Sequence, residues 1–91
     1  MAPNITELCL RRMPLISNIT FADIFRELTL LETVDLADCT GLYSSGLQLL
    51  LRNNKNITDL QLSGCTHAVD DSAMRLITTL KDLIFLDVSF S

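Results

Sequence analysis

The chain has 91 residues, enough for one domain with a modest hydrophobic core. Its hydrophobic fraction of 48% excludes a disordered chain, and because only 5% of the residues are aromatic we expect leucine and isoleucine to fill the interior. The net charge of −4 argues against a surface that binds nucleic acid, so we expect no nucleic-acid partner.

One pattern of apolar residues occurs four times along the chain. Its members are Ile5, Leu8, Leu10 and Met13, then Leu31, Val34, Leu36 and Cys39, then Ile57, Leu60, Leu62 and Cys65, and finally Leu83, Leu86, Val88 and Ser91. The copies begin at residues 5, 31, 57 and 83, so each begins 26 residues after the one before. A fixed period between 20 and 50 residues is typical of stacked-repeat proteins. We therefore predict a single domain over residues 1–91, with three full repeats starting near residues 5, 31 and 57 and a fourth strand at 83–91.

Each copy of the pattern predicts a short strand. Val34 and Leu36 alternate with Thr33, Asp35 and Ala37, the period of two expected for a strand with one buried face. The corresponding strands are predicted at residues 8–10, 60–62 and 86–88. Because every strand is entered in the same way, we expect the four strands to pair in parallel.

The segment after each strand changes to helical spacing. Leu47, Leu50 and Leu51 follow the i, i+3, i+4 pattern of a helix with one buried face, and residues 21–28 and 73–80 repeat it. Ser45 and Gln48 fit a capping box at the start of the middle helix. Residues 20–23 and the acidic segment 70–72 offer the other two starts. The predicted fold class is therefore α/β, with one strand and one helix in each unit.

These motifs resemble a known family. The pattern L-x-x-L-x-L-x-x-[CN] followed by a short helix resembles the leucine-rich repeat, and the period of 26 with Cys39 and Cys65 at its end is similar to the cysteine-containing subtype. Residues 42–47 and 68–73 keep several positions of that subtype's x-x-I-T-D-x-G-L segment. The resemblance implies a solenoid with parallel strands on its concave face and short helices on its convex face. Similar repeats recognise substrates in F-box and Zyg-type receptors of cullin-RING ubiquitin ligases, and others occur in adaptors and assembly factors.

The outward side of the predicted sheet is the candidate binding surface, as in other repeat proteins. Alternation directs outward Glu7, Cys9, Arg11, Thr33, Asp35, Ala37, Asp59, Gln61, Ser63, Phe85, Asp87 and Ser89, with Arg12, Asp38, Gly64 and Phe90 at the strand exits. Five of these residues are acids and only Arg11 and Arg12 are bases. The other five bases, predicted on helical segments, are Arg26, Arg52, Lys55, Arg75 and Lys81.

This segregation of charge favours a protein partner with a basic segment. The predicted protein-binding residues are Glu7, Arg11, Asp35, Asp38, Asp59, Gln61, Phe85 and Asp87. The alternative is that the acids are solvated charges on an exposed face. Phe85 and Phe90 have two interpretations as well: they are binding anchors, or a further repeat buries them.

Several other residues are predicted to be structural. Cys39 and Cys65 occupy equivalent positions, where we expect buried thiols that meet the turn backbone, whereas Cys9 faces outward. His67 is predicted in a solvent-facing turn, because a zinc site would need four well-placed ligands. The sequence contains neither a G-x-S-x-G motif nor a glycine-rich phosphate loop. We therefore predict no catalytic, metal or cofactor site and no cofactor.

The predicted function is protein–protein interaction without catalysis. The resemblance implies substrate recognition for a ubiquitin ligase, with a ligase adaptor as a further partner. The alternative is an adaptor or complex-assembly factor unrelated to ubiquitin. No segment resembles a secretory signal or approaches the roughly 20 apolar residues of a membrane-spanning helix, so we expect an intracellular protein, cytoplasmic or nuclear, without a membrane partner.

Overall fold

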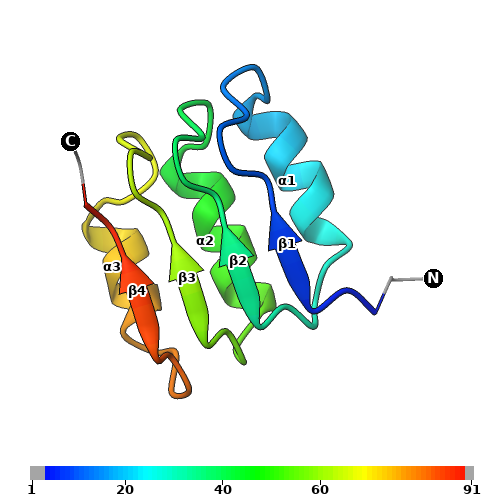
Figure 1. The fold of residues 1–91 in the computed structure, drawn as a ribbon, viewed down its shortest axis with the longest axis vertical. Coiled ribbons are helices and arrows are strands. Elements are labelled where there is room, and N and C mark those ends of the chain that lie inside the picture. Colours follow the sequence, from blue (N-terminus) through cyan, green and yellow to red (C-terminus); the bar gives the residue numbers. More distant parts are fainter. Residues whose placement is uncertain (1–3, 90–91) are drawn as a thin grey trace.

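The computed structural model describes residues 4–89, in which four short strands alternate with three helices (Figure 1). The strands are β1 (Glu7–Cys9), β2 (Thr33–Asp35), β3 (Asp59–Gln61) and β4 (Phe85–Asp87), and the helices are α1 (Asn18–Arg26), α2 (Ser44–Asn53) and α3 (Asp71–Ile77). The strands form one parallel sheet in the order β1-β2-β3-β4. The helices lie side by side against one face of this sheet (Figure 1). The predicted α/β class with parallel strands is confirmed.

The register of the sheet equals the spacing of the apolar pattern. Leu8 lies opposite Val34, Val34 opposite Leu60, and Leu60 opposite Leu86, so every strand pairs with residues 26 positions away. The strands lie one residue earlier than the predicted segments 8–10, 60–62 and 86–88. Leu10 still donates its N–H to the Asp35 carbonyl at 2.9 Å, but the chain turns directly afterwards and Leu10 falls outside the regular ladder.

The core lies between the sheet and the helices. Val34, Leu60 and the leucines that follow these strands are fully buried, as are Phe21 and Phe25 of α1. The rings of these two phenylalanines pack with their centroids 5.7 Å apart. Leucine supplies most of the remaining core, as expected from the low aromatic content.

Ala37 differs from the prediction, which placed it on the outward side of the sheet. It is fully buried. The regular strand ends at Asp35, and the Ala37 N–H donates to the Asp35 carboxylate at 3.1 Å. Arg12 of the first unit donates its N–H to the Ala37 carbonyl at 2.8 Å. The alternation of a strand no longer applies after the chain has begun to turn.

The strand exits share an unusual backbone conformation. Arg12, Asp38 and Gly64 occupy equivalent positions and have positive φ angles of 60°, 61° and 77°. A left-handed residue reverses the chain direction within one position, which allows each strand to pass at once into its turn. At Gly64 a Cβ atom would also lie too close to the Asp38 carboxylate, so any larger residue there would displace that side chain.

One of the three helices begins at the capping residue that the sequence predicted. Asp70 caps α3 as predicted, because its carboxylate accepts the Ala73 N–H at 2.8 Å. Helix α1 starts earlier than predicted, with Ser17 as the cap that accepts from Thr20 N. The predicted capping box at Ser45 is wrong, since α2 already begins at Ser44 with Tyr43 at the cap position and no side-chain cap bond.

The start of α2 is held instead by a residue of the preceding helix. The Asn18 side-chain oxygen accepts the Tyr43 N–H at 2.8 Å, and its amide donates to the Ser45 hydroxyl at 3.0 Å. Gly46 lies against the same asparagine, where a Cβ atom would collide with the Asn18 amide oxygen. Helices α1 and α2 are therefore joined by polar contacts as well as by apolar packing.

Asn54 makes a second polar connection between units, inside the core. Its side chain accepts the Leu31 N–H at 2.9 Å and donates to the carbonyls of Leu28 at 2.9 Å and Leu50 at 3.0 Å. The residue is only 1% exposed. It thereby pairs the end of α2 with the turn that leads into β2, and these backbone groups are satisfied without water.

In the part of the chain that is described, none of the helices has the length and apolar character needed to cross a bilayer.

Replacing Asn54 with leucine should destabilise the fold strongly. Leucine occupies the equivalent positions 28 and 80, but it leaves the Leu31 N–H and two carbonyls buried without partners. We expect a loss of about 2–4 kcal/mol in the free energy of unfolding, measured by urea denaturation. The exposed neighbour Asn56 is the matched control, and Asn56→Ala should change stability by less than about 0.5 kcal/mol. Equal stability of the two variants would contradict the role assigned to Asn54.

Candidate protein-binding face

The candidate site is the side of the sheet that faces away from the helices, here called the strand face. It comprises the outward residues of the four strands and Arg11, Arg12 and Asp38 directly after them. The register aligns Glu7, Thr33, Asp59 and Phe85 in one row and Cys9, Asp35, Gln61 and Asp87 in the next. Adjacent members of a row lie on strands about 4.8 Å apart. Six of the eight predicted binding residues are thus brought onto one side of the sheet, although they span residues 7 to 87 of the sequence. The other two, Arg11 and Asp38, lie directly after β1 and β2.

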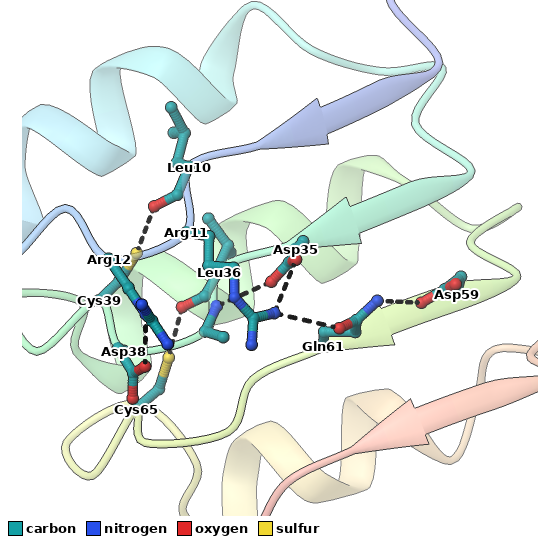
Figure 2. Close-up of polar contacts among 11 residues, drawn as sticks. Leu10, Arg11, Arg12, Asp35, Leu36, Asp38, Cys39, Asp59, Gln61 and Cys65 are labelled. Carbon is teal, nitrogen blue, oxygen red and sulfur yellow. Dashed lines mark hydrogen bonds and ion pairs between the residues drawn. The ribbon is translucent and has the colours of Figure 1, made fainter.

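Arg11 crosses the strand face (Figure 2). Its guanidinium nitrogen lies 3.0 Å from the Asp35 carboxylate and 3.4 Å from the Gln61 side-chain oxygen. Gln61 in turn donates to the Asp59 carboxylate at 3.3 Å. The hydrogen bond and the charge of Asp35 raise the pKa of Arg11 above its usual value. One arginine from the first unit therefore holds polar side chains of the second and third strands in a single network.

Arg12 makes a second ion pair at the strand exits. Its Nε lies 3.6 Å from the Asp38 carboxylate, and both side chains are largely exposed. Exposed pairs of this kind contribute little to stability. The ion pair matters more for the charge of the strand face. Both bases of this face, Arg11 and Arg12, are now paired with acids of the same face, Asp35 and Asp38.

The acids that remain are Glu7, Asp59 and Asp87, none of which forms an ion pair within residues 4–89. Asp59 lies directly beside Phe85 in the register, and Asp87 follows Phe85 by two positions on β4. The backbone N–H and hydroxyl of Ser89 donate to Asp87 at 3.0 and 2.8 Å. These bonds, with a smaller contribution from the charge of Arg11, lower the pKa of Asp87. Two of the three acids outside ion pairs, Asp59 and Asp87, therefore lie on the β3–β4 side of the face, and the third, Glu7, lies on β1.

The other bases lie away from the strand face, with one correction to the prediction. Arg26, Arg52 and Arg75 are in the helices, but Lys55 and Lys81 are in the turns that lead into β3 and β4. The helices end before these lysines, at Asn53 and Ile77. A pocket of about 390 Å³ lies between the two turns and is lined by Lys55, Asn56, Thr79, Lys81 and Asp82.

The aromatic residues of the last strand are only partly described. Phe85 is 48% exposed on β4, and its apolar neighbours Ile84 and Leu86 are 87% and 36% exposed. Phe90, the second predicted anchor, lies outside the described residues. Whether Phe85 binds a partner or is covered by a further segment remains a prediction with two alternatives.

The buried thiols each meet a backbone carbonyl of the preceding unit (Figure 2). Cys39 Sγ donates to the Leu10 carbonyl at 2.8 Å, and Cys65 Sγ donates to the Leu36 carbonyl at 2.9 Å. Both cysteines are fully buried and Cys9 is exposed, as predicted. Burial raises the pKa of Cys39, and it raises the pKa of Cys65 to about 11. A raised thiol pKa opposes nucleophilic chemistry, so these positions have the properties of structural cysteines.

His67 lies in an exposed turn, as predicted, and stacks on Tyr43. The ring centroids are 4.8 Å apart and the planes differ by 7°. Tyr43 was not predicted as a partner of His67, because the two residues belong to different units and nothing in the periodic pattern pairs them. Between residues 4 and 89, His, Cys, Asp and Glu side chains form no group of three or more that could hold a metal ion.

The chain was compared with known proteins at the level of family, sequence and structure. No family model matches it, and no curated protein and no solved structure matches it either. Family membership therefore stays a prediction from the sequence, and a function has to be argued from the geometry of the strand face.

The thiols provide a direct test of this description. With a pKa of about 11, Cys65 is roughly 0.1% thiolate at pH 8, and its side chain is inaccessible as well. We expect iodoacetamide at pH 8 to modify Cys9 in the folded protein and to modify all three cysteines after denaturation in urea. Mass spectrometry of the peptides measures each site separately. Alkylation of Cys39 or Cys65 in the folded protein at the rate of Cys9 would contradict the buried placement.

Proposed function

We propose that the chain is a non-catalytic protein-interaction module of the leucine-rich-repeat kind, which holds a partner protein on its strand face. In this proposal the strands form the concave side and the helices the convex side of a solenoid. The observation that carries it is the constant register, which gathers six of the eight candidate residues into two rows on a face that no helix covers within the described chain. A broad face of this kind is suited to a protein partner, because its side chains are spread across four strands.

The half of the face formed by β3 and β4 is the proposed site of first contact. Asp59 and Asp87 supply negative charge next to the exposed ring of Phe85. A partner segment that presents lysine or arginine beside an apolar side chain would satisfy both features. Asp35 is less suited to this role, because it already binds Arg11 and is only 16% exposed.

The proposed context is substrate recognition for a ubiquitin ligase of the F-box or Zyg kind, inside the cell. This context is supported by the resemblance of the repeats alone. The alternative is an adaptor or assembly factor that connects two proteins without a ligase. Both contexts use the same surface, and they differ in the proteins that would be bound together with the partner.

The test is a charge reversal on the strand face with a matched control. Asp59→Lys with Asp87→Lys should reduce capture of partner proteins from cell extract by at least about tenfold, because both changes repel a basic segment. The control, Glu27→Lys with Asp82→Lys, changes the net charge equally at exposed positions away from the face. Quantitative affinity purification with mass spectrometry measures both, and thermal melting verifies that both variants fold.

The outcomes separate the proposals. Partners lost by the strand-face variant and kept by the control support binding through this face, whereas identical capture by wild type and both variants would overturn it. Recovery of cullin and RING subunits with the wild type supports the ligase context. Recovery of a stable complex without those subunits supports the adaptor or assembly factor.

A further inference from the structure

Asp35 and Asp87 occupy equivalent positions, and the chain holds both carboxylates in the same way. They are two periods of 26 residues apart, and each is the last residue of its strand, β2 or β4. Oδ1 of Asp35 accepts the Ala37 N–H at 3.1 Å, and Oδ1 of Asp87 accepts the Ser89 N–H at 3.0 Å. Each carboxylate is therefore fixed by the residue two positions later, which leaves its second oxygen, Oδ2, for another donor.

The second oxygen of Asp35 binds a guanidinium group. Arg11 Nη1 donates to Asp35 Oδ2 at 3.0 Å and lies 3.4 Å from the side-chain oxygen of Gln61 (Figure 2). The arginine belongs to the unit before Asp35 and reaches across the strand face, so its cation lies between acceptors on two neighbouring strands. The structure thus contains one example of how this face holds an arginine side chain.

The corresponding place one strand further along lies between Gln61 and Asp87, by the constant register of the sheet. In the second and third units, the residues equivalent to Arg11 are Ala37 and Ser63. Their side chains are too short to bring a donor to this place. The difference between the two carboxylates therefore results from the identity of two residues inside the chain.

Asp87 consequently keeps an acceptor without a donor in the part of the chain that is described. Its side chain accepts hydrogen bonds from the N–H and the hydroxyl of Ser89, and both go to Oδ1. It belongs to none of the ion pairs within residues 4–89. The bonds from Ser89 lower the pKa of Asp87, so the carboxylate is ionised at neutral pH. A cation supplied from outside the chain would pair with its second oxygen.

We propose that Asp87 and Gln61 bind an arginine side chain of the partner protein, in the place that corresponds to the one Arg11 fills beside Asp35. Asp87 supplies the charged acceptor and Gln61 the neutral one. This inference rests on the proposed function, because it names the residue type that the strand face recognises in a basic partner segment.

Phe85 favours arginine over lysine at this place. It precedes Asp87 by two positions on β4, so the two side chains leave the strand on the same side of the sheet. Its side chain is 48% exposed. A planar guanidinium stacks on an aromatic ring while it donates to a carboxylate, whereas an ammonium group is more strongly hydrated and acts as a point charge. An arginine bound to Asp87 would therefore make a contact that a lysine makes less well.

Arg11 restricts this recognition to one part of the face. The Oδ2 atom of Asp35 is already paired with Arg11, and the Asp35 side chain is only 16% exposed. A partner arginine could bind there only by displacing Arg11. Removal of Arg11 should therefore give the face two sites for arginine in place of one.

Titration of the labelled chain with N-acetyl-L-arginine amide, followed by NMR, tests the proposal without the partner. The backbone amides of Ala37 and Ser89 report the two carboxylates, because each donates to one of them. In the wild type we expect the Ser89 amide to shift, with a dissociation constant on the order of millimolar, and the Ala37 amide to stay unchanged. In Arg11→Ala both amides should shift. Asp87→Asn should weaken binding at Ser89 at least about fivefold, because it removes the charged acceptor.

Two controls separate local recognition from general attraction of charge. Glu27→Gln changes the net charge as much as Asp87→Asn does, at an exposed position away from the face, and should leave binding unchanged. N-acetyl-L-lysine amide carries the same charge as the arginine probe and should bind at least about threefold more weakly. Phe85→Leu should remove this difference between the two probes, because it removes the aromatic ring.

The amide spectrum of each variant verifies its fold. Absence of a shift at Ser89 in the wild type would overturn the proposal, as would equal binding by the wild type and Asp87→Asn. A shift at Ala37 in the wild type, or none in Arg11→Ala, would overturn the role of Arg11. Equal binding of the lysine probe would overturn the preference for arginine.

These results are independent of partner capture, so the two proposals can fail separately. If the arginine probe binds as expected but charge reversal at residues 59 and 87 leaves capture unchanged, the proposed function fails and the arginine site stands. If capture depends on the face but the probe does not bind at Asp87, the arginine site alone fails.

Discussion

Parallel pairing at a constant register is the constraint on which the structure depends. Each strand has only three residues, and a strand of this length is not stable by itself. It is held by its neighbouring strands and by the helix layer behind the sheet. Because Leu8, Val34, Leu60 and Leu86 must lie opposite one another, the residues on either side of them are forced into rows on the strand face. The candidate binding surface is a direct product of the same pairing that buries the core.

The strand exits show how this constraint is satisfied at a point where regular structure ends. The exits of β1, β2 and β3 each take a left-handed residue. After β2 and β3 the chain then folds back so that a thiol reaches the carbonyl of the preceding unit. Cysteine suits this position because it is small, largely apolar and a weak donor. A larger polar residue would need more partners than one carbonyl, and an apolar residue would leave that carbonyl without its bond.

Periodicity in the sequence was sufficient to predict the strands, the helices, the parallel order of the strands and the burial of Cys39 and Cys65. It also placed the candidate residues on one side of the sheet. It identified equivalent positions, however, and not the contacts between residues at different positions. The Arg11 network spans 24 and 50 residues, and nothing local in the sequence pairs these side chains. The same holds for Asn18 at the start of α2 and for Asn54 in the core, whose counterparts in other units are different residues. Ala37 was misplaced because alternation was extended past the end of the strand.

Asn18 and Asn54 have a consequence for how the molecule opens. Each joins two adjacent units through hydrogen bonds, one in the helix layer and one in the core. A unit that detaches must therefore break polar contacts with its neighbour in addition to apolar ones. This links the first and second units into one cooperative block, whereas no equivalent asparagine joins the later units. Amide exchange should then be slowest around β2, and fluctuations should enter the protein from the β4 side.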